Sequence, residues 1–237
     1  MHRRNEKNVI VRQMSRWTVY DRIIVENPQL EKYWTRAHVL FPEVDNNNLL
    51  VDIESWYSIT PKDLADSISK EIAKKYGSAK ALDLFSGVGG NTISLLKYGH
   101  SVVSAELDYK KVKYLRYNVK QCIKTKPEHT ILHKDVYSPQ MLRCLEGRDF
   151  DALIASPPWG GVGYSTLTEL ELLNQCRILE LENMYEEKAK TRIYIIPRTI
   201  SKRLIHKVLE CKTYKGVSNQ RVVAHIVITG DSEGIKF

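Results

Sequence analysis

An acid followed by a glycine-rich turn is the first segment whose residue types could do chemistry. The segment reads Asp83-Leu84-Phe85-Ser86-Gly87-Val88-Gly89-Gly90. Glycine at Gly87 and Gly89 permits a tight turn and lets the backbone approach a ligand closely. The spacing is G-x-G-G rather than G-x-G-x-x-G, and no Gly-Lys-Ser/Thr follows, which disfavours both a dinucleotide fingerprint and a P-loop. We therefore expect the loop to bind a different nucleotide-like cofactor.

A second acid, Glu106, ends the next predicted strand. An acid on the first strand with an acid at the tip of the second is how S-adenosylmethionine-dependent enzymes hold their cofactor. The second carboxylate accepts hydrogen bonds from both ribose hydroxyls. We predict this role for Asp83 and Glu106, and the alternative is a tight turn flanked by two solvated acids.

The second chemical segment is Ser156-Pro157-Pro158-Trp159, directly after the apolar run 151–155. A strand cannot continue through two prolines, and open α/β sheets bind ligands at the carboxyl ends of their strands. A tetrad of this type at this place resembles the active site of methyltransferases that modify exocyclic amines of bases. The Ser156 hydroxyl and the Pro157 carbonyl can accept the N–H groups of such an amine, and Trp159 can stack on the base, most strongly if the ring is cationic. The alternative is a proline-rich loop with a core tryptophan.

The elements that position these segments follow an alternating pattern. From about residue 60, short β-type runs alternate with helical patterns, which predicts an α/β fold with a parallel sheet of six or seven strands. A helix is expected from Thr60, as N-cap, to Gly77. The other predicted helices are 91–98, 109–123, 139–145, one within 168–190, and 200–211, and the predicted strands are 80–85, 101–107, 129–132, 151–155, 192–196 and 222–228.

Charge and composition narrow the class of protein. The 237 residues include 36 Lys and Arg against 28 Asp and Glu, a net charge of +8 that suits a polyanionic partner. No apolar run is long enough for a membrane span, and no signal peptide is evident, so we expect no membrane contact. Four cysteines without metal-ligand spacing predict reduced thiols and no metal site. Half of the net charge falls in residues 1–36, within a predicted basic, mostly helical extension at 1–55 that precedes a domain at 56–237.

Three motifs together resemble the trimethylguanosine synthase family. They are Trp56-Tyr57-Ser58-Ile59-Thr60-Pro61, Asp83 to Thr92 with its glycine loop, and Ser156-Pro157-Pro158-Trp159-Gly160-Gly161. The likeness runs from about Lys32 to the end of the chain. It implies a Rossmann-like class I methyltransferase sheet with a small helical N-terminal extension. It also implies methyl transfer from S-adenosylmethionine to the exocyclic N2 of 7-methylguanosine RNA caps.

The resemblance assigns roles to individual residues. It makes Thr60 a contact to the methionine carboxylate and Asp135 the acid near the adenine. The cofactor-binding set it implies is Thr60, Asp83, Gly87, Gly89, Glu106 and Asp135. It implies that Trp159 stacks on the 7-methylguanine while Ser156 and Pro157 orient N2. Contacts to the cap phosphates fall on Lys32, Tyr164 and Arg198.

The chain also departs from the family pattern. The family usually has proline after the Gly-Gly pair, whereas Val162 stands here, which predicts a looser loop before Tyr164. Residues 1 to about 30 find no firm counterpart, and this basic arm could hold RNA beyond the cap through phosphates. The resemblance further implies small nuclear and nucleolar capped RNAs as partners, a location in the nucleus or nucleolus, and action as a monomer.

Two other functions remain open at this stage. One is a guanine-N2 or adenine-N6 methyltransferase acting on internal RNA or DNA positions, which would not require the 7-methyl group. The other is a methyltransferase fold without activity that serves as an RNA-binding module. The complete set formed by Asp83, the glycine loop, Glu106 and the Ser156–Trp159 tetrad argues against the second.

Overall fold

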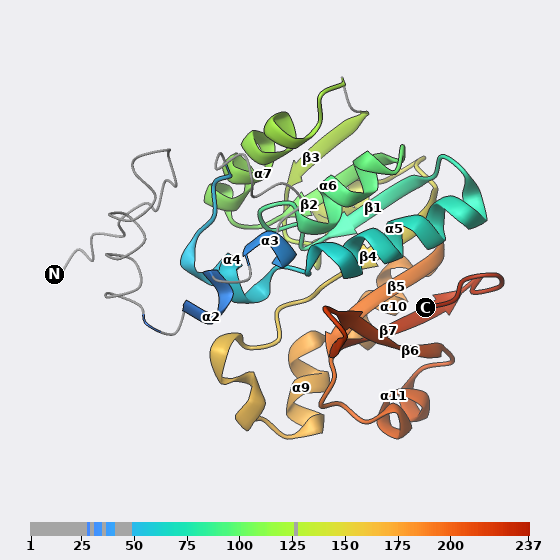
Figure 1. The fold of residues 1–237 in the computed structure, drawn as a ribbon. Helices are drawn as coiled ribbons and strands as arrows, with labels where there is room; N and C mark the ends of the chain where they lie inside the picture. The colour runs from blue at the N-terminus through green and yellow to red at the C-terminus, as the bar shows by residue number, and fades with distance from the viewer. Residues whose placement is uncertain (1–27, 29–30, 35–36, 41–48, 126–127) are drawn as a thin grey trace, which may run out of the picture.

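The fold is built around one β-sheet. The computed structural model describes residues 28, 31–34, 37–40, 49–125 and 128–237. Seven strands form one sheet in the order β3-β2-β1-β4-β5-β7-β6 (Figure 1). They are β1 (Lys80–Leu84), β2 (Ser101–Glu106), β3 (His129–His133), β4 (Phe150–Ala155), β5 (Ala189–Pro197), β6 (Lys212–Ser218) and β7 (Arg221–Gly230). The α/β, Rossmann-like prediction is confirmed.

Five strands pair in parallel, and β7 runs antiparallel to both β5 and β6. The prediction of a parallel sheet therefore holds for β1 to β5 only. The order reverses at β1, because β2 lies on one side of it and β4 on the other. At such a switch point the connections leave in opposite directions, and the crevice between them binds ligands. The segments that follow β1 and β4 are the glycine loop and the Ser156–Trp159 tetrad.

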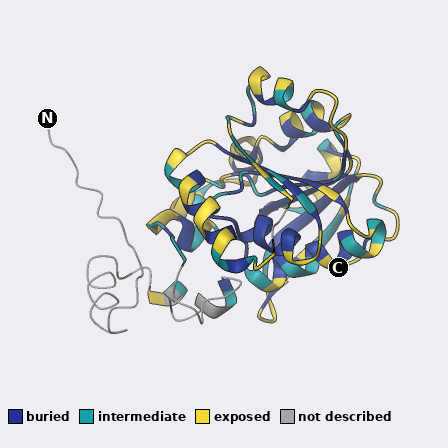
Figure 2. Cartoon of the chain, turned by 90° about the horizontal axis from the view of Figure 1, so that it is seen from above, coloured by how far each residue is buried: buried dark blue, intermediate teal, exposed yellow. Residues whose placement is uncertain are grey.

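Helices cover both faces of the sheet, and each face has its own apolar cluster. On one face lie α5 (Lys62–Tyr76), α6 (Gly90–Lys97) and α7 (Tyr109–Cys122), packed on alternate residues of the central strands. The other face carries α8 (Pro139–Cys144), α9 (Glu169–Cys176), α10 (Ile178–Tyr185) and α11 (Lys202–Val208). Burial is concentrated along the strands and the inward sides of the helices, as the view from above shows (Figure 2). A sheet buried on both faces explains the nearly continuous apolar strands.

The helix predicted within 168–190 is two helices. The first, α9, begins at a capping box in which Thr168 and Glu171 each bind the other's backbone. Arg177 then adopts a left-handed conformation with φ of 46°, which ends α9 and starts α10. The apolar pattern continues through this bend, because both helices bury their apolar sides on the same face of the sheet. The sequence therefore looked like one helix.

The C-terminal prediction needs two corrections. The helix expected at 200–211 occupies only Lys202–Val208, with Ser201 as the capping residue for Leu204 N–H. The residues after it form β6, an edge strand that the sequence did not reveal. Its pattern mixes exposed Lys212 and Lys215 with buried Gly216 and carries a bulge at Gly216/Val217, so no clean alternation signals a strand.

Helix α5 also starts differently from the prediction. The cap position is Pro61, which makes no side-chain hydrogen bond, so Thr60 is not the N-cap residue. The predicted end is correct, since Gly77 with φ of 67° follows the last helical residue. Thr60 instead lies buried beside the glycine loop.

The described part of the N-terminal extension contains α2 (Glu31–Trp34), α3 (Ala37–Leu40) and α4 (Ile53–Ser58). Leu40, Val51 and Trp56 form a small apolar cluster with Val88 of the glycine loop and Tyr114 of α7. Predicted features at 1–27, the basic arm included, lie outside the described residues. No helix in the described ranges is both long and apolar enough to span a bilayer.

Candidate active site

Asp83 lies at the centre of the first half of the site. It sits on β1 with its side chain fully buried, and one carboxylate oxygen, Oδ2, accepts a hydrogen bond from the Thr92 hydroxyl. The other oxygen, Oδ1, is buried and has no partner within the described chain. Burial raises the pKa of Asp83 to about 7, and the negative charge of Glu106 adds to the rise while the Thr92 bond opposes it. A buried acceptor without a partner is rare and indicates a missing donor.

The glycine loop is shaped by contacts that admit no side chain. Gly89 has φ of 109°, and a Cβ there would lie 2.8 Å from Leu115 Cδ1. A Cβ on Gly90 would lie 2.7 Å from Ile59 Cγ1 and 3.4 Å from the Thr60 carbonyl oxygen. The segment carrying Thr60 therefore approaches the start of α6 closely. The predicted cofactor residues Thr60, Gly87 and Gly89 are thus brought together next to Asp83.

Glu106 closes the loop from the neighbouring strand. One of its carboxylate oxygens accepts the Gly87 N–H at 2.8 Å, and the other accepts the Asp108 N–H at 2.8 Å. These two bonds fix the orientation of the carboxylate and leave further lone pairs for hydroxyl donors. Glu106 is 9% exposed and is the last residue of β2.

These residues fit S-adenosylmethionine. Its ammonium group matches the unpartnered Asp83 oxygen, and its ribose hydroxyls match the remaining acceptor capacity of Glu106. The glycine positions provide the close backbone approach that the molecule needs. Asp135, predicted to lie near the adenine, is exposed just after β3. Its carboxylate accepts the Tyr137 N–H at 3.0 Å.

The second half of the site follows β4. Ser156 is half-buried, and its hydroxyl makes no hydrogen bond within the described residues, whereas Pro157 is buried. The Trp159 indole Nε1 donates to the Ile195 carbonyl oxygen at 3.2 Å, and the Tyr164 ring meets it edge-on with centroids 5.5 Å apart at 71°. The indole is therefore held in one orientation beside the β1–β4 switch point.

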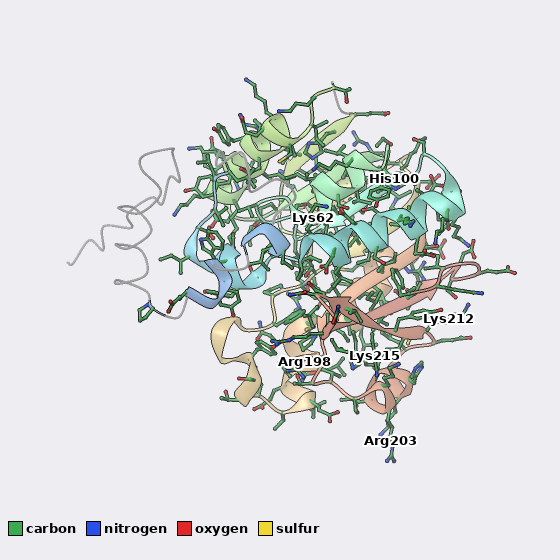
Figure 3. The ribbon with its side chains drawn as sticks, viewed as in Figure 1. Lys62, His100, Arg198, Arg203, Lys212 and Lys215 are labelled. Atoms are coloured by element: carbon green, nitrogen blue, oxygen red, sulfur yellow. The ribbon has the colours of Figure 1, made fainter. Side chains whose placement is uncertain are left out.

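The three residues predicted to contact the cap phosphates lie in different parts of the structure. Tyr164 lies against Trp159, in the 3₁₀ turn Gly161–Thr166, whose residues contact α4. Arg198 is exposed at the end of β5 and is labelled in Figure 3. Lys32 belongs to α2, and its side chain lies outside the described residues.

Sequence reasoning missed two features of the site. Asn118 of α7 bonds both the N–H and the carbonyl of Leu50, and it also donates to the Val88 carbonyl at 2.9 Å. It thus ties the extension to the glycine loop. The second feature is a stack beside Asp135, in which the Phe85 ring lies 5.9 Å from the Tyr137 ring and the Arg177 guanidinium covers Tyr137 at 3.5 Å. Tyr137, an aromatic residue just after β3, was the available signal.

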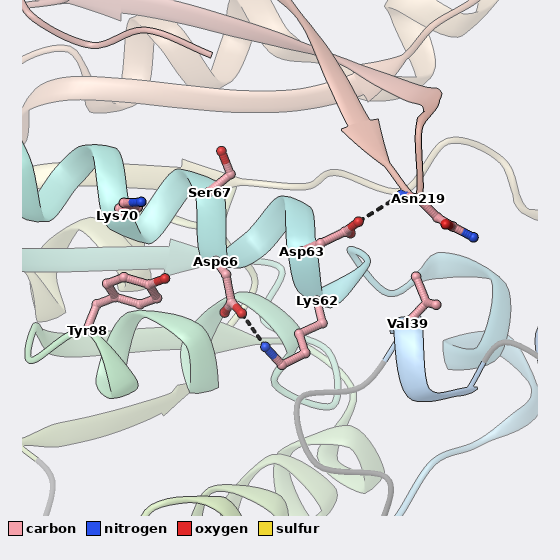
Figure 4. A pocket seen from close by; sticks show the side chains of 8 residues that line it. All are labelled: Val39, Lys62, Asp63, Asp66, Ser67, Lys70, Tyr98 and Asn219. Atoms are coloured by element: carbon pink, nitrogen blue, oxygen red, sulfur yellow. Dashed lines mark hydrogen bonds and ion pairs between the residues drawn. The ribbon is translucent and has the colours of Figure 1, made fainter.

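A groove of about 550 Å³ lies apart from these residues (Figure 4). It follows the first turns of α5, and its carboxylates are already paired: Asp66 binds Lys62, and Asp63 accepts the Asn219 N–H. The predicted cofactor-binding and catalytic residues lie instead around the carboxyl ends of β1 and β4. Among the described residues, no group of three or more His, Cys, Asp or Glu side chains could hold a metal ion.

Comparison with known proteins decides the family. The model of a family described as RNA cap guanine-N2 methyltransferase matches residues 78–222, which contain the glycine loop, Glu106 and the Ser156–Trp159 tetrad. The chain belongs to this family. It is an S-adenosylmethionine-dependent guanosine methyltransferase with RNA as its substrate, as predicted.

Curated relatives agree with this membership. The trimethylguanosine synthase of Schizosaccharomyces pombe is 29% identical over 211 residues, covering 87% of this chain and 84% of the relative. The trimethylguanosine synthase of Saccharomyces cerevisiae is 32% identical over 146 residues, covering 59% of this chain and 44% of the relative. The predicted resemblance to trimethylguanosine synthases is confirmed.

Solved structures support the fold of this cap methyltransferase. A magnesium protoporphyrin IX methyltransferase from Synechocystis with bound S-adenosylmethionine has a TM-score of 0.53 at 14% identity, covering 88% of this chain and 95% of that one. A 16S ribosomal RNA guanine-N2 methyltransferase from Thermus thermophilus has a TM-score of 0.52 at 19% identity, covering 76% of this chain and 43% of that one. At these identities the likeness concerns the fold alone.

Proposed function

We propose that this family member adds methyl groups to N2 of the 7-methylguanosine cap on small nuclear and nucleolar RNAs, with Trp159 as the platform for the cap base. The observation that carries the proposal is the Trp159 indole, held by the Ile195 carbonyl and the Tyr164 ring. It lies on the segment after β4, and β4 is the neighbour of β1 and its glycine loop at the switch point. The roles of these residues are inferred from this arrangement and from the family resemblance.

Trp159 provides both affinity and selectivity in this scheme. Methylation at N7 makes the guanine ring cationic, and a cation is attracted to the negative face of an indole. A base stacked on an aromatic side chain gains about 1 to 3 kcal/mol. The Ile195 and Tyr164 contacts prevent the indole from rotating, so the base plane and the exocyclic amine are fixed with it.

Ser156 and Pro157 orient the amine. Its lone pair is delocalised into the purine, which makes it a weak nucleophile. Acceptors at the Ser156 hydroxyl and the Pro157 carbonyl draw the N–H groups towards them and aim the lone pair at the methyl carbon. S-adenosylmethionine, when bound, supplies this carbon as an electrophile. Rate then comes mainly from positioning, and the chain needs no strong base because the proton leaves a nitrogen that has become cationic.

The experiment is methyl transfer from labelled S-adenosylmethionine, with products resolved by mass. The substrates are a 7-methylguanosine cap dinucleotide, the unmethylated cap dinucleotide and an uncapped RNA. Transfer only to the 7-methylated cap, with a gain of one or two methyl groups, is the expected result. Equal transfer to uncapped RNA would favour an internal guanine or adenine target and contradict the proposal.

Cofactor binding separates the enzyme from an inactive RNA-binding module. The buried, unpartnered oxygen of Asp83 supports cofactor binding, because a protein that only held RNA would gain nothing from that cost. Calorimetry with S-adenosylmethionine measures it directly. We further propose a monomeric enzyme located in the nucleus, to be checked by sedimentation and by imaging of a fluorescent fusion.

A further inference from the structure

A group of cations lies beside the site on the α11 side of the sheet. Arg198 is exposed after β5, Lys202 is the first residue of α11, and Lys215 is exposed on the edge strand β6. Arg198 and Lys215 are labelled near one another below the β6–β7 hairpin (Figure 3). We refer to Arg198, Lys202 and Lys215 as the basic edge.

Contacts with the sheet bring the three cations together. The Lys202 ammonium donates to the Thr213 carbonyl oxygen of β6 at 3.1 Å. Lys215 lies two residues further along β6 and is paired with His225 of β7. His225 also meets the backbone of Arg198, and both Lys202 and Lys215 lie within electrostatic range of its ring.

His225 lies buried next to the cations of the basic edge. Its side chain is 8% exposed, and its Nδ1 has no hydrogen-bond partner within the described chain. Burial lowers the pKa of His225, and the charges of Lys202 and Lys215 lower it further. Glu169, a nearby acid on α9, bonds the Ser201 N–H.

Several lysines of the described chain are neutralised by ion pairs, whereas the cations of the basic edge are not. Lys62, Lys75, Lys111 and Lys190 each bind a carboxylate. Arg198, Lys202 and Lys215 form no ion pair with any described acid. Three exposed cations without ion pairs to described acids, gathered around one strand pair, favour an anion.

We propose that the basic edge binds the phosphate backbone of the nucleotides that follow the cap. This inference rests on the proposed cap substrate. It identifies a second, sequence-independent contact that begins at Arg198, just after the strand whose Ile195 carbonyl holds Trp159, and continues over α11 and β6. Backbone contacts of this kind fix the orientation of an RNA without reading its bases.

Binding of a capped single-stranded RNA, measured by fluorescence anisotropy, tests the proposal. The variant combines Lys202→Ala with Lys215→Ala, neither of which belongs to the cofactor or base pocket. We expect RNA affinity to fall about tenfold, and the slope of log affinity against log salt between about 50 and 200 mM to decrease by about 1.4, from two contacts of about 0.7 each. Affinity for the cap dinucleotide should not change.

Matched variants separate charge from folding. Arg116→Ala with Lys120→Ala removes two exposed cations from α7, which covers the opposite face of the sheet, and should leave RNA binding unchanged. Lys202→Arg with Lys215→Arg should retain RNA binding, and a thermal melt compares the folding of all variants. In methyl-transfer assays the alanine variant should raise KM for capped RNA about tenfold, while KM for the cap dinucleotide and kcat stay the same.

The outcomes distinguish this proposal from the proposed function. RNA binding equal to that of the wild type, or an equal loss for capped RNA and cap dinucleotide, would overturn the basic edge as an RNA surface. Wild-type affinity no greater for capped RNA than for the dinucleotide would overturn it as well. Absence of cap methylation together with a charge-dependent loss of RNA binding would instead refute the cap substrate and leave the RNA surface standing.

Discussion

The Thr92 hydroxyl donates to one carboxylate oxygen of Asp83 and leaves the other without a partner. Thr92 in turn contacts the Ser104 hydroxyl at 2.8 Å, and Ser104 contacts His129 Nε2 at 2.9 Å. Burial lowers the pKa of His129 to about 4, so the ring is neutral and can donate through Nε2. His129 then donates to Ser104, Ser104 donates to Thr92, and Thr92 donates to Asp83. These hydrogen bonds orient the carboxylate and leave its second oxygen without a donor among the described residues.

Replacing Asp83 with asparagine should weaken S-adenosylmethionine binding and stabilise the ligand-free protein. Burial raises the folded-state pKa of Asp83 to about 7, above its unfolded value of 3.8. The folded state therefore binds more protons between these values, and wild-type stability falls as pH rises from about 4 to about 7. The excess in Tm of Asp83→Asn over the wild type should grow across this range, by about 2 to 4 °C per kcal/mol gained. Melting curves at several pH values measure it, and an excess that shrinks with rising pH would contradict the assignment.

The same pKa predicts the pH dependence of cofactor binding. The ammonium group of S-adenosylmethionine requires Asp83 in its charged form, which predominates above pH 7. Cofactor affinity of the wild type should fall by about tenfold per pH unit once the pH is well below 7. Affinity of Asp83→Asn should be low and insensitive to pH in this range. Calorimetric titrations from pH 5 to about pH 8 provide the comparison.

Replacing Thr92 with valine keeps the shape of the side chain and removes the donor. The buried Asp83 carboxylate then loses the hydroxyl bond to Oδ2, and weakening the satisfaction of a buried acceptor costs about 1 to 3 kcal/mol. We expect a loss of stability of this size and weaker cofactor binding. Thr92→Ser, which retains the hydroxyl, is the matched control and should bind the cofactor more tightly than Thr92→Val. Equal binding by the two variants would show that the donor is dispensable.

Replacing Gly90 with alanine should disturb the contact between the Ile59–Thr60 segment and the glycine loop. The new Cβ would lie 2.7 Å from Ile59 Cγ1, and overpacking of this kind costs about 1 to 3 kcal/mol. We expect cofactor affinity to fall because Thr60 is displaced. The second substitution Ile59→Ala removes the clashing atoms and should restore part of the affinity. A double variant no better than Gly90→Ala would locate the defect elsewhere.

Replacing Trp159 with alanine should abolish cap methylation while cofactor binding remains close to that of the wild type. Loss of stacking worth about 1 to 3 kcal/mol weakens cap affinity by roughly 5- to 150-fold, and loss of orientation lowers kcat further. Trp159→Phe, with a smaller ring, should retain partial activity. Because Trp159 also packs against both apolar clusters, thermal melts accompany the assays. Near-normal turnover by Trp159→Ala would exclude the stacking role.

Much of the site followed from residue types alone. The sequence predicted a tight turn from Gly87 and Gly89, and it predicted the end of a strand from the two prolines after Ala155. Together with the acids on two successive strands, these signals allowed the elements and the family to be predicted. Strand ends of a parallel sheet also meet at one edge, which places the glycine loop near the Ser156–Trp159 tetrad without coordinates.

Tertiary structure decided what local patterns leave open. The β6 edge strand exists because β7 offers it a pairing partner, and the bend at Arg177 exists because two helices must bury their apolar sides on one face. Asn118 became a link between the extension and the loop, and Lys202 approached Lys215, only once helices and strands were packed. Local sequence encodes backbone conformation and the chemistry of single side chains. Contacts between residues distant in the chain depend on packing, and packing decides which oxygen of Asp83 lacks a partner and which cations lack an acid.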